Sequence, residues 1–203
     1  HRGIQGLEAA KYAKRVIAAD INPAALATAK KSAMEARLKT ISFVQSDLFS
    51  NLKNRVFDCI IFNPPYLPTE KGVEDVALDA GKRGNEIILR FLESAPDHLS
   101  ADGTIVLLFS SQSRPKEIMD KAESLLFDFR LLDKQHIFFE DLFVYVLTKS
   151  PFLKSLETKG ITSIAAFTHG RHGKIYTGYK NKKKVAIKTA LNSQFEAHIQ
   201  NES

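Results

Sequence analysis

The chain has 203 residues, 44% of them hydrophobic and 9% aromatic, a composition typical of a globular protein with one sizeable core and a smaller appendage. No run approaches the roughly 18 apolar residues that a membrane-spanning helix needs, and no signal sequence opens the chain. These features argue against a membrane protein and predict a cytoplasmic location.

The net charge of +6 is unevenly distributed along the chain. Residues 1–150 carry 20 basic and 20 acidic side chains, whereas residues 151–203 carry 9 basic and 3 acidic ones. This change coincides with the end of the last strand-like run, so it predicts a boundary near Ser150 and Pro151. We expect one domain over residues 1–150 and a small basic unit over residues 151–203.

Short apolar runs and helical patterns alternate through the first of these units. The runs predicted to be strands are 15–20, 41–47, 56–62, 103–111, 127–135 and 141–149. The predicted helices are 23–38, 85–99 and 114–127. This alternation predicts an α/β fold with a doubly wound, mostly parallel sheet, in which the last two strands pair antiparallel at one edge. The single cysteine, Cys59, lies in the third strand and is predicted to be a small core residue.

Polar residues close the first three predicted strands, at Asp20, Asp47 and Asn63. Ligands of such sheets bind outside the carboxyl ends of the strands. There Asp20 can accept hydrogen bonds from both hydroxyls of a ribose, and Asp47 can accept one from an adenine amino group. Helix capping is the better interpretation of each aspartate taken alone. The combination with Asn63 favours a nucleotide site.

Asn63 begins the tetrapeptide Asn63-Pro64-Pro65-Tyr66, which directly follows the third strand. Proline lacks the backbone N–H of a sheet ladder, fixes its own φ and restricts the residue before it to extended conformations. The chain at Asn63 must therefore leave the sheet as a stiff, polar hook that ends in an aromatic ring.

Four segments together carry a family resemblance: "GIQGLEAAK", "VIAADINPAAL", "FVQSDLF" and "FDCIIFNPPYLPT". They resemble the S-adenosylmethionine-dependent methyltransferases of the HemK-like family, which methylate the glutamine amide of translation termination factors. The resemblance covers about residues 3–148 and is strongest to the archaeal and eukaryotic branch, which often works with a small zinc-binding activator subunit. The tetrapeptide indicates methylation of a planar nitrogen, and it also occurs in adenine N6 and guanine N2 methyltransferases of nucleic acids.

The resemblance implies that S-adenosylmethionine is the cofactor. The residues that would bind it are Gly3, Asp20, Ile21, Asp47, Leu48 and Asn63. Gly3 would be the last glycine of the family's glycine-rich loop, and Ile21 would pack on the adenine. The family's first strand and most of that loop do not precede Gly3, so we expect either a fragment of a longer protein or the product of a truncated gene.

The resemblance also assigns roles to the hook. An amide or exocyclic amine is a poor nucleophile because its lone pair is delocalised, so an enzyme must orient the nitrogen and stabilise its developing charge. The side-chain oxygen of Asn63 and the carbonyl of Pro64 would accept its two N–H groups, Pro65 would keep the hook rigid, and Tyr66 would lie against its flat face. No metal is required, and His169 and His172 are interpreted as solvated residues of a basic loop.

Residues 167–189 resemble the first three strands of a protein kinase. They contain Gly170 and Gly173 of a glycine-rich phosphate loop and a Val-Ala-Ile-Lys strand that ends at Lys188. A helix at 195–203 would bring Glu202 to this lysine. No catalytic His-Arg-Asp or metal-binding Asp-Phe-Gly follows, so no phosphoryl transfer is expected from these residues. The alternative is a basic β-hairpin with a solvated lysine-rich turn.

Three functions remain open on the sequence. Residues 1–150 are neutral overall, which favours a protein substrate over a nucleic acid, because nucleic-acid binding normally needs a positive footprint. An N6-adenine methyltransferase is the first alternative, with the basic tail supplying that footprint. The second is a degenerate, non-catalytic scaffold.

Overall fold

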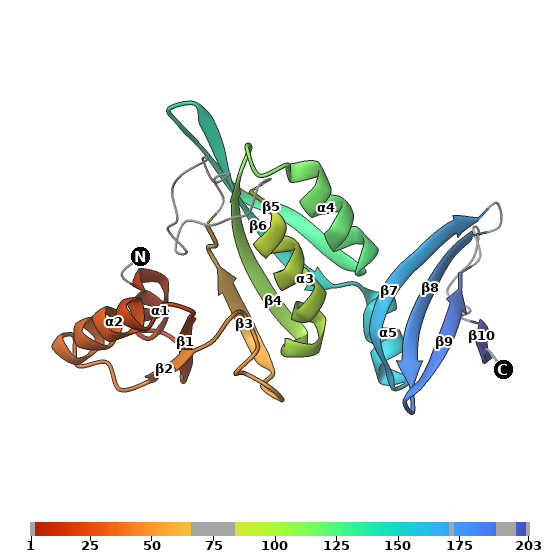
Figure 1. The fold of residues 1–203 in the computed structure, drawn as a ribbon, viewed down its shortest axis with the longest axis horizontal. Helices are drawn as coiled ribbons and strands as arrows, with labels where there is room; N and C mark the ends of the chain where they lie inside the picture. Colours follow the sequence, from red (N-terminus) through yellow and green to blue (C-terminus); the bar gives the residue numbers. More distant parts are fainter. Residues whose placement is uncertain (1–2, 66–83, 171–172, 190–197, 202–203) are drawn as a thin grey trace. The chain divides into compact units, whose positions relative to one another are not determined.

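The structure is a computed structural model that describes residues 3–65, 84–170, 173–189 and 198–201 (Figure 1). It divides into two compact units, His1–Arg55 and Val56–Ser203. In the part of the chain that is described, no helix is long and apolar enough to cross a membrane.

The first unit is a pair of parallel strands with two helices. Its elements are α1 (Ile4–Ala9), β1 (Val16–Asp20), α2 (Pro23–Glu35) and β2 (Ile41–Gln45). The strands pair in register from Val16 opposite Ile41 to Asp20 opposite Gln45, so both carboxyl ends meet at one edge. The start of α2 is fixed by Asn22, whose side-chain oxygen accepts hydrogen bonds from the backbone N–H groups of Ala24 and Ala25.

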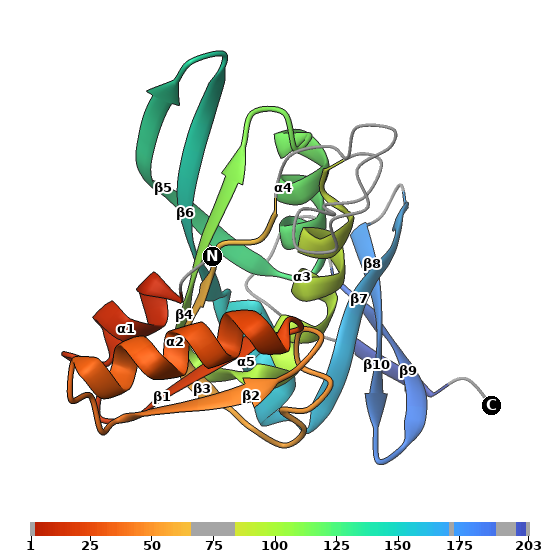
Figure 2. The ribbon, with the colours of Figure 1, turned by 60° about the vertical axis from the view of Figure 1, so that its left-hand side comes forward.

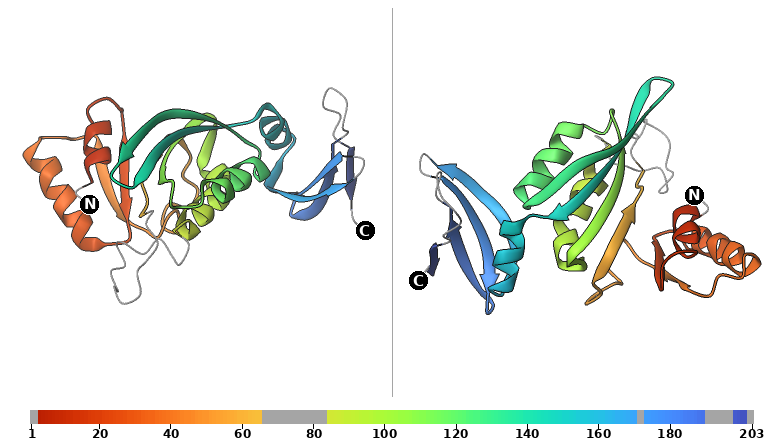
Figure 3. Two further views of the ribbon diagram at one scale, coloured as in Figure 1. Left: turned by 90° about the horizontal axis from the view of Figure 1, so that it is seen from above. Right: turned by 180° about the vertical axis from the view of Figure 1, so that it is seen from behind.

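The second unit contains a four-stranded sheet. Its elements are β3 (Phe57–Phe62), α3 (Glu86–His98), β4 (Leu99–Ser110), α4 (Pro115–Ser124), β5 (Phe127–Ile137) and β6 (Glu140–Lys149). The strand order is β3-β4-β6-β5, with β3 parallel to β4 and the other pairs antiparallel. Helices α3 and α4 lie on the same face of this sheet (Figures 1 and 3). The side chains buried between the two layers include Ile88, Leu92, Ile105, Phe109 and Ile118.

A second β-layer follows within the same unit. It consists of α5 (Pro151–Thr158), β7 (Ile161–Gly170), β8 (Gly173–Lys180), β9 (Lys183–Lys188) and β10 (His198–Asn201), with the strands antiparallel in the order β10-β9-β8-β7. One face of this sheet packs on α5. The resulting core is Leu126, Phe152, Leu153, Leu156, Ile161, Ile164, Tyr176, Val185 and Ile187. Because Leu126 precedes β5, this core reaches back across the predicted boundary at residue 150, which stays a prediction.

All six strands and three helices predicted for residues 1–150 are present, and the two expected edge strands pair antiparallel. Two expectations are wrong. Cys59 is exposed, because β3 is the edge strand of its sheet among the described residues and one of its faces is uncovered there. The expected terminal helix is not formed at His198–Asn201, because this segment instead pairs with the otherwise open edge of β9.

A buried ion pair fastens α5 to the end of β6. The ammonium group of Lys149 lies 2.6 and 2.8 Å from the two carboxylate oxygens of Glu157, and the lysine side chain is only 4% exposed. Removing one partner of a buried pair leaves a charge without compensation, which is far more costly than losing an exposed pair. The pair therefore fixes where the second β-layer attaches to the first.

We expect Glu157→Ala to lower the free energy of unfolding by about 3 kcal/mol, because it leaves the buried ammonium unpaired. Urea unfolding monitored by circular dichroism would measure it. Asp102→Ala is the matched control, since it breaks the pair between Lys154 and a carboxylate that is 95% exposed, and should destabilise the protein far less than Glu157→Ala. Equal losses in both variants would contradict the structural role of the buried pair.

Candidate functional site

The carboxyl ends of β1 and β2 place Asp20 and the turn after β2 side by side. Asp20 is the last residue of β1 and lies opposite Gln45, two residues before Asp47. The backbone N–H of Ser46 donates to the carbonyl of Asp20, and Gln45 Nε2 donates to the carbonyl of Ile21 at 3.2 Å. These bonds tie both strand ends into one rigid edge, so four of the predicted cofactor residues are brought together.

Asp20 is not itself the N-cap of α2, because Asn22 takes that position, but Asp20 binds the backbone of the cap residue. Its Oδ1 accepts from the backbone N–H of Asn22 at 2.8 Å, and Asn22 in turn caps α2. A carboxylate accepts about four hydrogen bonds, so this local bond does not compete with binding of two ribose hydroxyls. Ile21, the next residue, is 48% exposed and presents an apolar surface beside the carboxylate.

The turn that contains Asp47 and Leu48 is fixed by hydrogen bonds to the buried side chain of Ser46. The buried hydroxyl of Ser46 donates to the carbonyl of Leu48 at 2.8 Å and accepts from the backbone N–H of Asn51 at 3.0 Å. Leu48 has a φ of +49°, a conformation that costs a residue with a side chain about 1 kcal/mol or more. Strained backbone of this kind persists where the surroundings fix it, as the Ser46 bonds do here.

Glycine is required at position 3 for two reasons: its backbone conformation and the lack of room for a side chain. Its φ is +61°, and a Cβ atom placed on it would lie 2.8 Å from the Cβ of Ala29 in α2. A larger residue would force α1 and α2 apart, so only glycine allows the chain to enter α1 here.

Asn63 carries an unusual polar group at the end of β3. It directly follows β3, and its Oδ1 is buried without a hydrogen-bond partner among the residues that the structure describes. Buried polar atoms nearly always have a partner, and an unsatisfied one costs about 1–3 kcal/mol. The unpartnered oxygen makes Asn63 a candidate for hydrogen bonding to a ligand.

The surroundings of Asn63 hold it in place. Phe62, the last residue of β3, stacks on Phe91 of α3 with ring centroids 4.1 Å apart. Pro64 is buried and Pro65 half-buried, so the chain leaves the sheet as a packed segment rather than a solvated one. Tyr66 lies outside the described residues, so its stacking role stays a prediction. Asn63 also belongs to a different unit from Asp20, and its predicted contact with the cofactor is likewise untested.

Asn85 was missed by the sequence reasoning. It is fully buried at the start of α3, and its Nδ2 donates to Glu117 Oε2 at 3.0 Å. Its Oδ1, like that of Asn63, is buried without a partner among the described residues. A helix that connects two parallel strands begins at the edge where the first strand ends, so Asn85 and Asn63 lie at the same edge of the sheet. An asparagine before a helical pattern is a common capping signal, which hid its unsatisfied oxygen.

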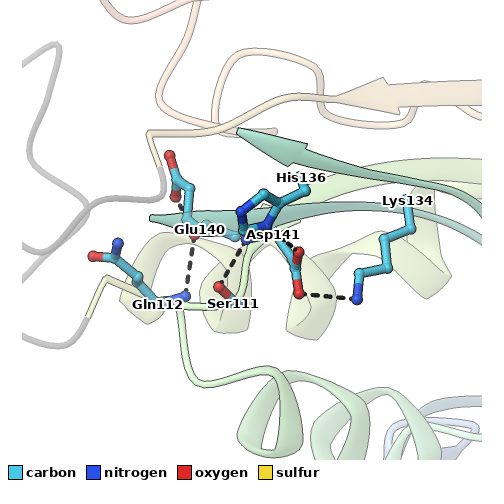
Figure 4. Close-up of polar contacts among 7 residues, drawn as sticks. Ser111, Gln112, Lys134, His136, Glu140 and Asp141 are labelled. Carbon is cyan, nitrogen blue, oxygen red and sulfur yellow. Dashed lines mark hydrogen bonds and ion pairs between the residues drawn. The ribbon is translucent and has the colours of Figure 1, made fainter. Parts of the chain in front are cut away.

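A second missed cluster lies where β4 ends and β6 begins (Figure 4). The hydroxyl of Ser110 donates to Glu140 and accepts from the backbone N–H of Gln112. Ser111 and Asp141 exchange two hydrogen bonds, from Ser111 N–H to the Asp141 carbonyl at 2.8 Å and from Asp141 N–H to the Ser111 hydroxyl at 3.0 Å. The predicted strand ended at Ser111, so the strand-end rule applied to Asp20 and Asn63 could have found this cluster.

Asp141 is also the centre of a charged group in the same figure. Its carboxylate lies 2.9 Å from Lys134 Nζ and 2.9 Å from His136 Nδ1 (Figure 4). Hydrogen bonding to Lys134, and secondly to His136, lowers the pKa of Asp141 below its usual value. Asp141 therefore stays ionised at neutral pH and holds both side chains on the β5–β6 hairpin.

The C-terminal sheet has part of the expected kinase-like arrangement. β7, β8 and β9 are consecutive antiparallel strands, Gly170 lies opposite Gly173, and Lys188 is exposed at the end of β9. His172 and Glu202 lie outside the described residues. Within the described part of the chain, no three His, Cys, Asp or Glu side chains are grouped to hold a metal ion.

Known proteins resemble most of this chain. A family model described as the methyltransferase small domain matches residues 2–135. A curated protein of Methanocaldococcus jannaschii, named as a protein N5-glutamine methyltransferase, is 39% identical over 141 residues, which cover 67% of this chain and 71% of that protein. The match to the family ends at residue 135, before the C-terminal sheet. The kinase resemblance of that sheet stays a prediction.

Two other curated relatives match over shorter segments. The ribosomal protein uL3 glutamine methyltransferase of Xanthomonas campestris is 38% identical, over 43% of this chain and 31% of that protein. The human methyltransferase HEMK2 is 34% identical, over 49% of this chain and 50% of that protein. The chain thus spans half or less of the length of these two relatives.

Solved structures share the fold at low sequence identity. A methyltransferase from Pyrococcus furiosus superposes with a TM-score of 0.58 at 19% identity, over 72% of this chain and 69% of that one. The Mtq2–Trm112 complex of E. cuniculi, described as responsible for methylation of the termination factor eRF1, gives 0.51 at 22% identity, over 74% and 96%. The chain therefore belongs to the methyltransferase small domain family, and S-adenosylmethionine is its methyl donor.

Proposed function

We propose that this protein methylates the side-chain amide nitrogen of a glutamine, and that the glutamine belongs to a translation termination factor. The observation that carries the proposal is the buried, unpartnered Oδ1 of Asn63 at the end of β3. An amide nitrogen offers two N–H donors, and this oxygen is an acceptor that the described residues leave unused. The carbonyl of Pro64 is the second predicted acceptor.

The residues of the first unit fit the cofactor. Asp20 and Asp47 offer carboxylates at one edge, Ile21 offers an exposed apolar surface beside them, and Gly3 leaves no room for a side chain against α2. When bound, S-adenosylmethionine supplies an electrophilic methyl group on a sulfonium. The task left to the protein is to hold the target nitrogen with its lone pair towards that methyl group.

Three considerations favour a protein substrate. The related proteins from M. jannaschii and X. campestris are named as glutamine methyltransferases. Residues 1–150 have no net charge with which to attract phosphates. A glutamine on a flexible loop also enters a narrow pocket without the few kcal/mol that extrusion of a paired base requires. We further propose a cytoplasmic location and, from the Mtq2–Trm112 complex, a small activator subunit as partner.

The alternatives make different predictions about cofactor and substrate. A non-catalytic scaffold would show no thermal shift with S-adenosylmethionine, whereas an enzyme should be stabilised by it. An N6-adenine methyltransferase would bind the cofactor equally well but would transfer label to nucleic acid. The excess of basic side chains in residues 151–203 is the feature that keeps this second alternative open.

We expect Asn63→Ala to reduce kcat by roughly 100-fold or more and to leave cofactor affinity mostly unchanged. Loss of an acceptor aimed at the reacting nitrogen should cost about 2–4 kcal/mol in the transition state. Single-turnover methylation and calorimetric cofactor binding would measure the two effects. Ser100→Ala is the control, since its hydroxyl bonds Asp58 at the opposite end of the β3–β4 pair. Activity of Asn63→Ala within twofold of wild type would remove Asn63 from the catalytic site.

We expect Asp20→Asn to weaken cofactor binding about tenfold, or about 1.4 kcal/mol. The amide can still accept from Asn22 N–H, so the local turn and stability should be retained while an acceptor for the ribose hydroxyls is lost. Asp20→Ala should weaken binding and also destabilise α2. If the asparagine variant binds S-adenosylmethionine as tightly as wild type, Asp20 serves only to hold the turn before the Asn22 cap.

The substrate assay uses the protein as its native gene encodes it, with the activator subunit present. Labelled S-adenosylmethionine is offered with a termination factor, its Gln→Ala variant in the Gly-Gly-Gln loop, ribosomal protein uL3 and mixed nucleic acids. We expect label on the termination factor and none on its variant. Label on uL3 alone would transfer the proposal to a ribosomal glutamine, and label on nucleic acid alone would overturn it.

A further inference from the structure

The turn of the β5–β6 hairpin exposes two adjacent phenylalanines. Phe138 is 88% exposed and Phe139 94% exposed, and they are the two residues that connect the last cross-strand pair, Ile137 and Glu140. Single exposed apolar residues are common on protein surfaces. Two neighbouring aromatic rings with almost no contact to the rest of the protein are unusual and suggest a binding partner.

The backbone at this turn is unfavourable for phenylalanine. Phe138 has a φ of +51°, a region that bulky residues rarely adopt. Two-residue hairpin turns normally place glycine or asparagine at such positions, and a phenylalanine there costs about 1–2 kcal/mol. Neither exposure nor backbone conformation therefore stabilises the fold, so folding does not explain why phenylalanine occupies this turn.

The rest of the hairpin holds the turn in a defined position. Asp141 binds Lys134 and His136 across the two strands, and Glu140 accepts a hydrogen bond from Ser110 at the end of β4. A β-bulge between Leu131 and Asp133 changes the direction of the strand below these contacts. These contacts fix the position of the two phenylalanines, as is typical of anchor residues in a binding surface.

This hairpin extends beyond the edge of the sheet at which β3 and β4 end (Figure 2). Phe62 of β3 lies opposite Leu107 of β4, which lies opposite Tyr145 of β6. Phe139 is six residues further along, so it stands roughly 20 Å beyond the end of β3. That is too far to contact a target glutamine, but it lies within the footprint of a protein that presents one, since a typical interface covers about 800 Å² on each partner.

The charges around the turn select the kind of partner. Residues 133–141 contain three carboxylates, on Asp133, Glu140 and Asp141, but only one lysine, Lys134. This excess of negative charge disfavours phosphate groups. Aromatic anchors with an acidic rim complement a protein surface that has an apolar pocket edged by basic side chains.

We propose that Phe138 and Phe139 are a docking pair that binds the body of the protein substrate while its glutamine lies at Asn63. This inference rests on the proposed function and adds to it a second contact site remote from the reacting nitrogen. The pair would supply affinity for the whole substrate and would take no part in methyl transfer. It would therefore lower KM and leave kcat unchanged, as expected of an interaction equal in ground and transition states.

The test compares two substrates with the double variant Phe138→Ala and Phe139→Ala. One substrate is the intact termination factor, and the other is a short peptide with the same Gly-Gly-Gln loop. For the intact factor, we expect KM to rise tenfold or more with kcat unchanged. For the peptide, which cannot reach the hairpin, both constants should stay within twofold of wild type. Phe167→Ala is the matched control, because Phe167 is 69% exposed on β7, far along the chain from the hairpin.

Each other outcome overturns the inference in a recognisable way. If wild type methylates the intact factor and the double variant does so equally well, the docking role is wrong and the proposed function stands. Equal losses on factor and peptide would mean that the pair supports the catalytic site itself. A wild-type dimer that dissociates in the variant by sedimentation, or loss of the activator subunit, would assign the pair to those partners. No methylation of either substrate by wild type would overturn the proposed function and this inference with it.

Discussion

The amide oxygen of Asn63 is the constraint on which the interpretation of this protein depends. It is an acceptor removed from water and left without a donor among the described residues, in a position where packing of Phe62 on Phe91 and burial of Pro64 prevent it from turning away. Buried polar groups nearly always have a partner, and an unpaired acceptor at a strand end is the kind of group that a bound molecule can satisfy. The surrounding elements can be understood as the means of holding this one oxygen still.

Local hydrogen bonds also fix the polar residues at the other strand ends. Asp20 is fixed by Asn22, and the turn after β2 is fixed by Ser46. Ser110 joins the ends of β4 and β6 through Glu140. Each strand end is thus held by short local bonds, and the carboxylate of Asp20 can still accept further hydrogen bonds. Rigidity before binding reduces the entropy that a ligand must lose when it is ordered.

Much of this arrangement could be predicted from the sequence because it follows local rules. Continuous apolar runs marked β3 and β4, and the two consecutive prolines marked the point where the chain leaves the sheet. The exposure of Cys59 could not be predicted, since it depends on which strand lies at the edge of its sheet and on what covers it. Likewise, Asn85 resembled an ordinary helix cap until the structure placed its oxygen in a buried position without a partner. Strand-end residues are visible in sequence, whereas their unused hydrogen-bonding capacity is a property of three-dimensional packing.

The core that contains Leu126 has a thermodynamic consequence for the β5–β6 hairpin. Leu126 precedes β5 and is buried with α5, β7, β8 and β9, while Lys149 ends β6 and is paired with Glu157 of α5. Both ends of the hairpin are thus rooted in the C-terminal layer rather than only in the methyltransferase sheet. By linkage, a ligand that stabilises this layer also makes local opening at the base of the hairpin less frequent, and an event that loosens the layer makes it more frequent. A segment that lies outside the methyltransferase family match can in this way regulate how steadily an element of the enzyme's own sheet is held.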